Sequence, residues 1–251
     1  DMEHFTLCEE NPLLEPDSNL LIGYDNLEQT DWNIVDCRDL VVVENPEDGL
    51  YYGYFAAAAD VGRGCPVGVI AVAVSDDLVH WREQSIVYTP RQNGVIEVPD
   101  VFFLDGKWYL TILTGSHYAG RSIVSDPYVC KCTIYASADS PRGPFVEDEH
   151  NILIGGIEQS GYTCRTFWFE GKRYLMYIDC SHGGNTLSLP KEIGVRDGRL
   201  CALYTPLVQK LRQRQTTWIG REETLELLPT SFAWRTFGGR SHSLSDGYEI
   251  E

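Results

Sequence analysis

A repeated strand–turn–strand pattern constrains the fold of this chain more than any other feature of its sequence. Residues 40–58, 101–115 and 166–179 each contain an apolar strand, an acid–glycine turn, and a second strand rich in aromatic residues. The turn glycines Gly49, Gly106 and Gly171 recur at intervals of 57 (106 − 49) and 65 (171 − 106) residues. A turn of this kind between two such strands is typical of a β-hairpin.

A second hairpin follows in two of these repeats. Residues 69–81 and 133–145 each contain an apolar strand that ends in Ser-x-Asp, then a short turn and an aromatic residue. Two hairpins make a four-stranded sheet, and such sheets arranged radially form a β-propeller, so we predict an all-β propeller fold. A β-sandwich is the rival, but its turns at about every 8–12 residues would not produce the long repeat. Only residues 203–214 favour a short helix, with Pro206 in its first turn.

Charge and composition limit the partners that this chain can bind. With 37 acidic and 20 basic residues among 251, its formal net charge is −17. Such a surface repels phosphate backbones, which argues against nucleic acid as a partner, whereas a neutral sugar is compatible with it. No stretch approaches the roughly 18 consecutive apolar residues of a membrane span, so we expect no membrane partner. No motif predicts a cofactor.

The eight cysteines favour free thiols over a metal site. None forms a C-x-x-C pair, and Cys130 with Cys132 offers only two of the four ligands that a tetrahedral site needs. We therefore expect no metal. Buried free thiols, together with the lack of a signal peptide and of an Asn-x-Ser/Thr acceptor, slightly favour a cytoplasmic location, which the sequence does not otherwise determine.

Five motifs in order resemble those of the family 32 glycoside hydrolases, which include invertases, levanases and inulinases. Arg38-Asp39 and Glu97-Val98-Pro99-Asp100 are similar to the Arg-Asp-Pro and Glu-Cys-Pro-Asp motifs of that family, and 58 residues (97 − 39) separate them, about one blade. Three further segments extend the resemblance over residues 1–212: 75–81 (S-x-D-L-x-x-W), 161–167 (similar to Y-A-x-Q-T-F) and 187–212 (similar to the run that leads out of the last blade).

The resemblance implies a glycosidase that cleaves β-fructofuranosides such as sucrose or fructans with retention. Retaining enzymes pair an ionised carboxylate with a second carboxyl group of raised pKa. By resemblance Glu97 is the acid/base, and its apolar neighbours Val95, Ile96 and Val98 would favour its protonated form. Asp39 would stabilise the transition state. Because each motif precedes the same kind of strand pair, we expect the two acids at equivalent places in neighbouring repeats.

Further residues are expected to bind the sugar. Arg38 would hold a hydroxyl group or keep Asp39 ionised. Asp100 is a further candidate for the binding site, where we expect it mainly to hold the scaffold and to orient Arg38. The aromatic candidates for stacking on a sugar face are Trp32, Tyr118 and Tyr162.

The chain also departs from the family. Leu40 replaces a proline, Val98 replaces a cysteine, and the Asn-Asp-Pro-Asn-Gly motif that carries the nucleophile is missing. No context singles out a substitute among Asp17, Asp25, Asp31 and Asp36. We therefore expect a propeller of the five-bladed type that is incomplete at its N-terminus, with blades 2–5 present.

The expected domain organisation follows from the extent of the resemblance. Residues 1–212 would form the propeller, and residues 213–251 a linker, the start of a β-sandwich or a ring-closing strand. An incomplete ring exposes strand edges, which predicts pairing with another chain or a homo-oligomer.

Two other functions remain open. One is a neighbouring class of propeller glycosidase, in which Asp39 would be the general base of an inverting reaction on arabinose or xylose polymers. The other is a propeller that binds carbohydrate without cleaving it, which the missing nucleophile motif favours.

Overall fold

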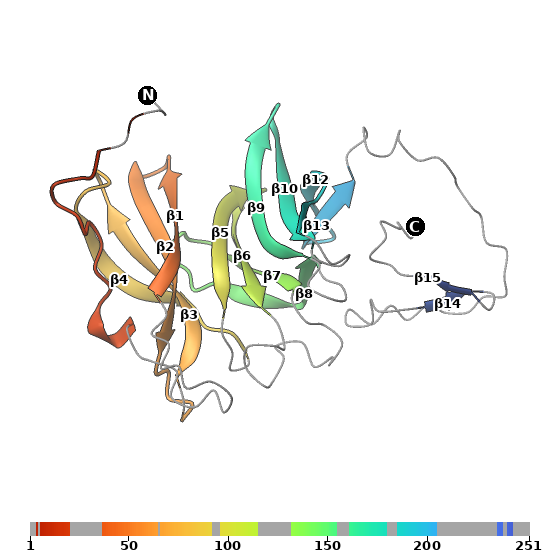
Figure 1. Cartoon of the computed structure of the whole chain (residues 1–251), viewed down its shortest axis with the longest axis horizontal. Coiled ribbons are helices and arrows are strands. Elements are labelled where there is room, and N and C mark those ends of the chain that lie inside the picture. The colour runs from red at the N-terminus through yellow and green to blue at the C-terminus, as the bar shows by residue number, and fades with distance from the viewer. Residues whose placement is uncertain are drawn as a thin grey trace.

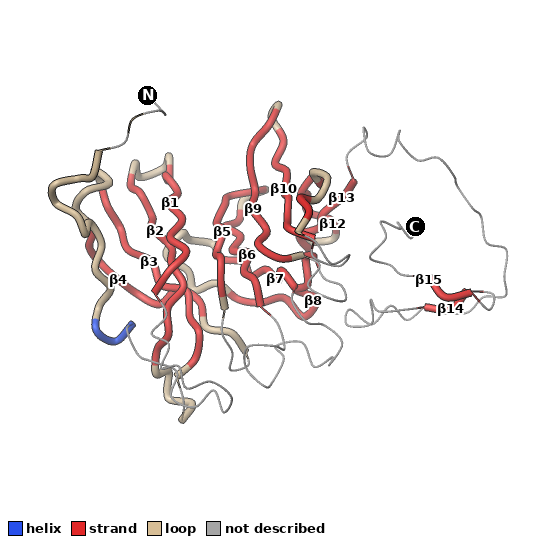
Figure 2. Tube along the Cα trace, viewed as in Figure 1, coloured by secondary structure: helices blue, strands red, loops and turns tan. Residues whose placement is uncertain are grey.

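The computed structural model describes residues 4, 6–20, 37–64, 66–91, 96–114, 132–154, 161–179, 185–204, 235–237 and 240–242. These residues form strands joined by loops, with one short 3-10 turn, η1 (Ser18–Leu20) (Figure 2). The strands are β1 (Cys37–Asn45), β2 (Leu50–Ala59), β3 (Val67–Ser75), β4 (Trp81–Tyr88), β5 (Glu97–Leu104), β6 (Lys107–Thr114), β7 (Cys132–Ala138), β8 (Val146–Ile154), β9 (Tyr162–Phe169), β10 (Lys172–Asp179), β11 (Thr186–Leu187), β12 (Lys191–Arg196), β13 (Arg199–Tyr204), β14 (Arg235–Phe237) and β15 (Arg240–His242).

The strands form three main antiparallel sheets, as the repeat predicts. β1–β4 make the first sheet and β5–β8 the second, each in chain order. The third contains β9, β10, β12 and β13, and the short β11 pairs with the end of β10. β14 and β15 form a separate two-stranded hairpin. Figure 1 shows the three sheets side by side, and β1 lies against β5 as β5 lies against β9. The all-β prediction is confirmed.

The acid–glycine turns have the geometry that the sequence predicts. Two-residue loops join β5 to β6, β9 to β10 and β12 to β13, and in each loop both residues have positive φ. This is the requirement of a type I′ turn, whose twist matches that of the two strands. The loop residues are Asp105 (47°) and Gly106 (82°), Glu170 (48°) and Gly171 (77°), and Asp197 (51°) and Gly198 (76°).

The second sheet packs on both of its neighbours. Because successive residues of a strand point to opposite faces, Val101 faces the first sheet while Phe102 faces the third. The core between the first and second sheets includes Tyr54, Ile70 and Leu110, and the core between the second and third includes Tyr109, Tyr135, Leu175 and Ile193. Burial of each large apolar side chain contributes about 1.5–3 kcal/mol, so these two cores hold the sheets face to face.

The aromatic residues that follow the second hairpin turns occupy different surfaces. Phe145 is buried between the first two sheets, edge-on to Tyr54 with ring centroids 6.3 Å apart. Trp81 instead lies over Gly53 on the other face of the first sheet, where a Cβ at Gly53 would come within 2.7 Å of its ring. Phe145 therefore fills the space between two sheets, whereas Trp81 covers the opposite face of the first sheet.

Some expectations fall partly outside the described residues. Leu203 and Tyr204 end β13, so the helix predicted over 203–214 does not begin there. Residues 6–20 contain turns and η1 but no strand, although residues 5–12 resemble the end of a first blade. The described residues form three main sheets, so the number of five blades stays a prediction. The domain division at residue 212 and the pairing of exposed strand edges also stay predictions. No helix among the described residues is long and apolar enough to cross a membrane.

Candidate active site

The same β-bulge interrupts the first strand of all three sheets. In β1 the register against β2 shifts between Arg38 and Val41, and in β5 the register against β6 shifts between Glu97 and Asp100. In β9 the shift lies between Tyr162 and Arg165, which pair with Ile178 and Met176 of β10. Each bulge has one residue in the left-handed region: Asp39 (61°), Val98 (52°) and Thr163 (53°). Bulges re-aim side chains and are frequent beside active sites.

The bulges define which residues are equivalent between the sheets. Arg38, Glu97 and Tyr162 begin the three bulges, and Asp39, Val98 and Thr163 follow them. Asp39 and Glu97 are therefore not equivalent, and the expectation that they occupy matching positions is wrong by one residue.

The number of residues between each bulge and its turn glycine also shows which residues correspond. Glu97 and Tyr162 each precede their glycine by nine residues (106 − 97 and 171 − 162), whereas Arg38 precedes Gly49 by eleven (49 − 38). The loop between β1 and β2 has four residues, two more than the loops after β5 and β9, which accounts for the difference.

Arg38 nevertheless brings the two acids together. Its Nη2 donates to Oε1 of Glu97 at 2.9 Å, and its Nε lies 3.6 Å from Oδ2 of Asp39. The side chains of Arg38, Asp39 and Glu97 are 35%, 26% and 15% exposed, so the group is partly shielded yet open to a ligand. Two carboxylates on neighbouring strands thus contact one guanidinium. The environment of Glu97 is therefore not only apolar, as its sequence neighbours suggest, because the guanidinium of Arg38 lies beside its carboxyl group.

Asp39 also connects the first two sheets. Its Oδ2 accepts a hydrogen bond of 2.9 Å from the backbone N–H of Val98, the left-handed residue of the next bulge. Both of the contacts that Asp39 makes with described residues use Oδ2. Oδ1 is thereby the oxygen that remains for a ligand hydroxyl group.

Asp100 is buried against β9, unlike the partly exposed side chains of Arg38, Asp39 and Glu97. It is 7% exposed, and its Oδ2 accepts a hydrogen bond of 2.7 Å from the backbone N–H of Thr166 in β9. Burial raises the pKa of Asp100, while the hydrogen bonds from Thr166 and the charges of Arg165 and Arg173 oppose that rise. The contact of Asp100 with β9 makes it a scaffold residue of the joint between the second and third sheets, and its predicted role in orienting Arg38 stays untested.

The remaining candidates differ in what the structure says of them. Tyr162 opens β9 at the position equivalent to Glu97. Trp32 and Tyr118 lie outside the described residues, as do Asp25, Asp31 and Asp36. Asp17 is described: its backbone N–H bonds Gln84 of β4, the strand farthest from β1 in the first sheet. The η1 turn that follows Asp17 packs on β2, the strand next to β1, so the contact with Gln84 does not place Asp17 far from the bulge and its candidacy as the nucleophile stays untested.

Sequence reasoning missed two residues that support this site from the third sheet. Arg165 and Thr166 both contact the β5 bulge, the first through the carbonyl of Pro99 and the second through Asp100. Both lie in segment 161–167, which belongs to the family resemblance, but the sequence alone assigned neither residue a role. Their position at the end of the third bulge becomes visible once the offset of the turn glycines is counted.

The described residues offer little to a metal or a thiol reaction. They contain no group of three metal-ligating side chains. Burial raises the pKa of the Cys132 thiol to about 12 and that of Cys164 further, so both stay protonated at neutral pH. These two cysteines are free, as expected, and belong to the cores.

The fold is that of β-propeller glycoside hydrolases. A family 32 β-fructofuranosidase from Bombyx mori, solved as a mutant with sucrose, aligns with a TM-score of 0.54 and 18% identity over 82% of this chain and 42% of that one. An endo-1,4-β-xylanase from Bacteroides thetaiotaomicron aligns with a TM-score of 0.51 and 21% identity over 72% and 62%. A levansucrase mutant from B. megaterium aligns with a TM-score of 0.54 and 10% identity over 68% and 49%.

The likeness lies in the fold and not in the sequence. No protein-family model matches the chain, and no curated protein matches it. The chain spans 42–62% of the length of these three solved structures. Because the neighbours belong to several glycosidase families and share little sequence with this chain, the likeness establishes the fold and no substrate.

Proposed function

We propose that this chain contributes the sugar-cleaving site of a retaining glycoside hydrolase that acts on β-fructofuranosides of the sucrose or fructan class. One observation carries the proposal: Arg38 holds the carboxylates of Asp39 and Glu97 on neighbouring bulges of a fold shared with glycosidases. The order and spacing of the family 32 motifs favour the fructoside substrate. The proposal assigns the nucleophile to no residue.

In this proposal Glu97 protonates the leaving oxygen and later removes a proton from the attacking water. Its carboxyl group is 15% exposed, beside the buried Ile96, so it is partly desolvated yet within reach of a ligand. Arg38 fixes one of its oxygens and so limits the directions that the carboxyl group can take.

Asp39 supplies the electrostatic part of the mechanism. The N–H of Val98 and the guanidinium of Arg38 hold its Oδ2, which leaves Oδ1 to bind sugar hydroxyl groups as positive charge develops on the ring. A fixed carboxylate needs no reorganisation during the reaction, which is the source of its effect on the rate.

The test compares the full-length protein with its Glu97→Gln variant. Fructose release from sucrose and from a fructan should fall by about 10²–10⁴-fold, the usual contribution of a general acid. Glu44→Gln is the matched control, because it neutralises an exposed glutamate on β1, the strand that carries Asp39, and should leave the rate unchanged. Equal rates for the Glu97→Gln variant and the unchanged protein would remove Glu97 from the mechanism.

A second candidate is an inverting glycosidase on arabinose or xylose polymers, with Asp39 as the general base. The likeness in fold to an endo-1,4-β-xylanase, at a TM-score of 0.51, supports considering it. The stereochemistry of the first product, followed by NMR, separates the two reactions. Retention on a fructoside supports the first proposal, and inversion excludes it. Sugar binding in calorimetry with no turnover would instead favour a binding protein.

A further inference from the structure

The bulge of β5 that carries Glu97 has a strained backbone. Val98 has a φ of 52°, a left-handed conformation that is disfavoured for a β-branched residue. Pro99 follows it and has no N–H with which to pair. A backbone of this kind persists only when its surroundings hold it in place.

Each of the four bulge residues makes a contact from a neighbouring sheet. From the first sheet, Arg38 donates to Glu97 and Asp39 accepts from the N–H of Val98. From the third sheet, Nη1 of Arg165 donates to the carbonyl oxygen of Pro99 at 2.5 Å, and the N–H of Thr166 donates to Asp100. The direction of Glu97 is thus set by contacts from both sides.

Arg165 is the contact that fixes the backbone nearest to Glu97 from the third sheet. Pro99 is buried, and a buried carbonyl oxygen needs a partner. A guanidinium forms a short, charge-assisted hydrogen bond with such an oxygen, stronger than a neutral donor would form. Arg165 is itself the last residue of the bulge in β9, so one bulge holds the next.

We propose that Arg165 is a positioning residue for Glu97: by holding the Pro99 carbonyl, it fixes the direction in which the β5 bulge aims the Glu97 carboxyl group. This inference depends on the proposed acid/base role of Glu97. Arg165 acts through two residues of backbone, so its loss moves the acid without removing it.

The experiment measures full-length Arg165→Ala, Arg165→Lys, Glu97→Gln and the double variant Arg165→Ala/Glu97→Gln on two substrates. On sucrose, Arg165→Ala should lower kcat by about 10- to 100-fold, the scale of a misplaced catalytic group, with KM nearly unchanged. Arg165→Lys should recover most of the loss because it restores a charged donor. The double variant should be no slower than Glu97→Gln alone, since both changes affect one step.

The second substrate, β-fructofuranosyl fluoride, separates positioning from general damage. Fluoride leaves as an anion without a proton, so neither Arg165→Ala nor Glu97→Gln should slow its release in the first turnover by much, which is the rate compared on this substrate, because the later attack of water still needs Glu97 as a base. Arg142→Ala is the matched control. Arg142 follows β7 of the second sheet and forms an exposed ion pair with Glu83 in β4 of the first sheet, so its loss should leave kcat unchanged on both substrates.

The outcomes distinguish failure of this inference from failure of the proposed function. A slow Glu97→Gln variant beside an unaffected Arg165→Ala variant overturns the inference alone, as does an equal loss on both substrates. An unaffected Glu97→Gln variant overturns the proposed role of Glu97. A structure of Arg165→Ala gives a readout that needs no turnover: an unmoved Val98 φ and an intact Arg38–Glu97 contact would also overturn the inference.

Discussion

Two groups of residues with positive φ have different consequences. Asp105, Glu170 and Asp197 lie in hairpin turns, precede a glycine and match a type I′ turn. Val98 and Thr163 are β-branched and lie in the bulges of β5 and β9, beside the candidate site. The first group suits its conformation, whereas the second carries strain that the neighbouring sheets must offset.

Glu170 is the least suitable residue of the turn group. Asparagine and aspartate adopt the left-handed conformation more readily than glutamate. Glu170→Asn should therefore raise the free energy of unfolding, by about 0.5–1 kcal/mol, the scale of backbone substitutions that match the native conformation. Asp105→Asn, in the equivalent turn of the second sheet, is the control and should change stability little. Urea denaturation measures both, and a loss of stability in Glu170→Asn would contradict the turn assignment.

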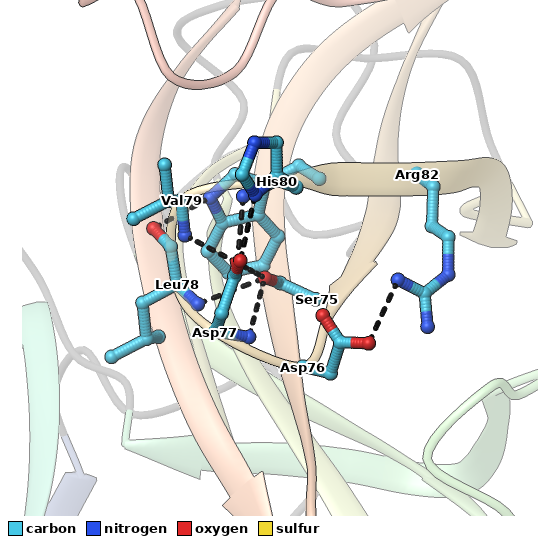
Figure 3. Close-up of polar contacts among 8 residues, drawn as sticks. Ser75, Asp76, Asp77, Leu78, Val79, His80 and Arg82 are labelled. Atoms are coloured by element: carbon cyan, nitrogen blue, oxygen red, sulfur yellow. Dashed lines mark hydrogen bonds and ion pairs between the residues drawn. The ribbon is translucent and has the colours of Figure 1, made fainter. Parts of the chain in front are cut away.

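The turn between β3 and β4 is the most heavily hydrogen-bonded element of the first sheet. Oγ of Ser75 accepts from the N–H groups of Asp77 and Leu78, and Oδ1 of Asp77 accepts from those of Val79 and His80 (Figure 3). Oδ2 of Asp77 lies 2.6 Å from Nδ1 of His80. This hydrogen bond lowers the pKa of Asp77 and raises the pKa of His80.

The shift at His80 predicts a pH dependence with a definite sign. Because its folded pKa is raised, its stabilising contribution is complete below the unfolded value of about 6.5 and is lost as the pH rises through the folded pKa. The Asp77 contribution has the opposite sense, because it is present above about pH 3.9 and lost as the pH falls through the folded pKa. The effects are small, since the pair is exposed.

The measurement is the melting temperature of the unchanged protein and of His80→Gln at about pH 5.5 and about pH 8.5, on either side of the ordinary histidine pKa. The difference between the two proteins should be larger at the lower pH. Arg82→Gln is the control, because it breaks an exposed ion pair with Asp76 in which no histidine takes part, so its effect should not depend on pH. A difference for His80→Gln that is the same at both pH values would contradict the pairing.

At the scale of elements, the sequence predicts what local chemistry determines. The acid–glycine turns at Gly106 and Gly171 and the aromatic strands after them lie where the sequence predicts them. The bulges were not predicted, because a single extra residue such as Val98 reverses the alternation of faces without changing the composition. The expectation that Asp39 and Glu97 are equivalent was wrong because the two motifs place their acids at successive positions of matching bulges.

At the scale of the whole molecule, contacts between sheets hold the structure together, and no sequence pattern within a single strand or turn predicts them. Val101 and Phe102, neighbours in β5, belong to different cores, and the polar joints repeat beside them: Asp39 to Val98, and Arg165 to Pro99. Each joins residues about one blade apart in the sequence, so only the packing of sheets reveals the pair. The candidate acids and Arg38 could be predicted from their motifs, whereas the contacts from the third sheet, by Arg165 and Thr166, could not.

The net charge of −17 acts on the molecule as a whole. Like charges repel across the surface, and raising the salt concentration from about 10 mM to about 150 mM shortens the Debye length from about 30 Å to about 8 Å. Screening should therefore raise the melting temperature over this range. It should leave kcat/KM for a neutral saccharide nearly unchanged, because such a substrate is neither attracted nor repelled. Calorimetry and rates at both salt concentrations test the two expectations. A melting temperature that falls with salt would show that ion pairs such as Arg38–Glu97 outweigh the repulsion, and a strong dependence of kcat/KM on salt would point to a charged substrate.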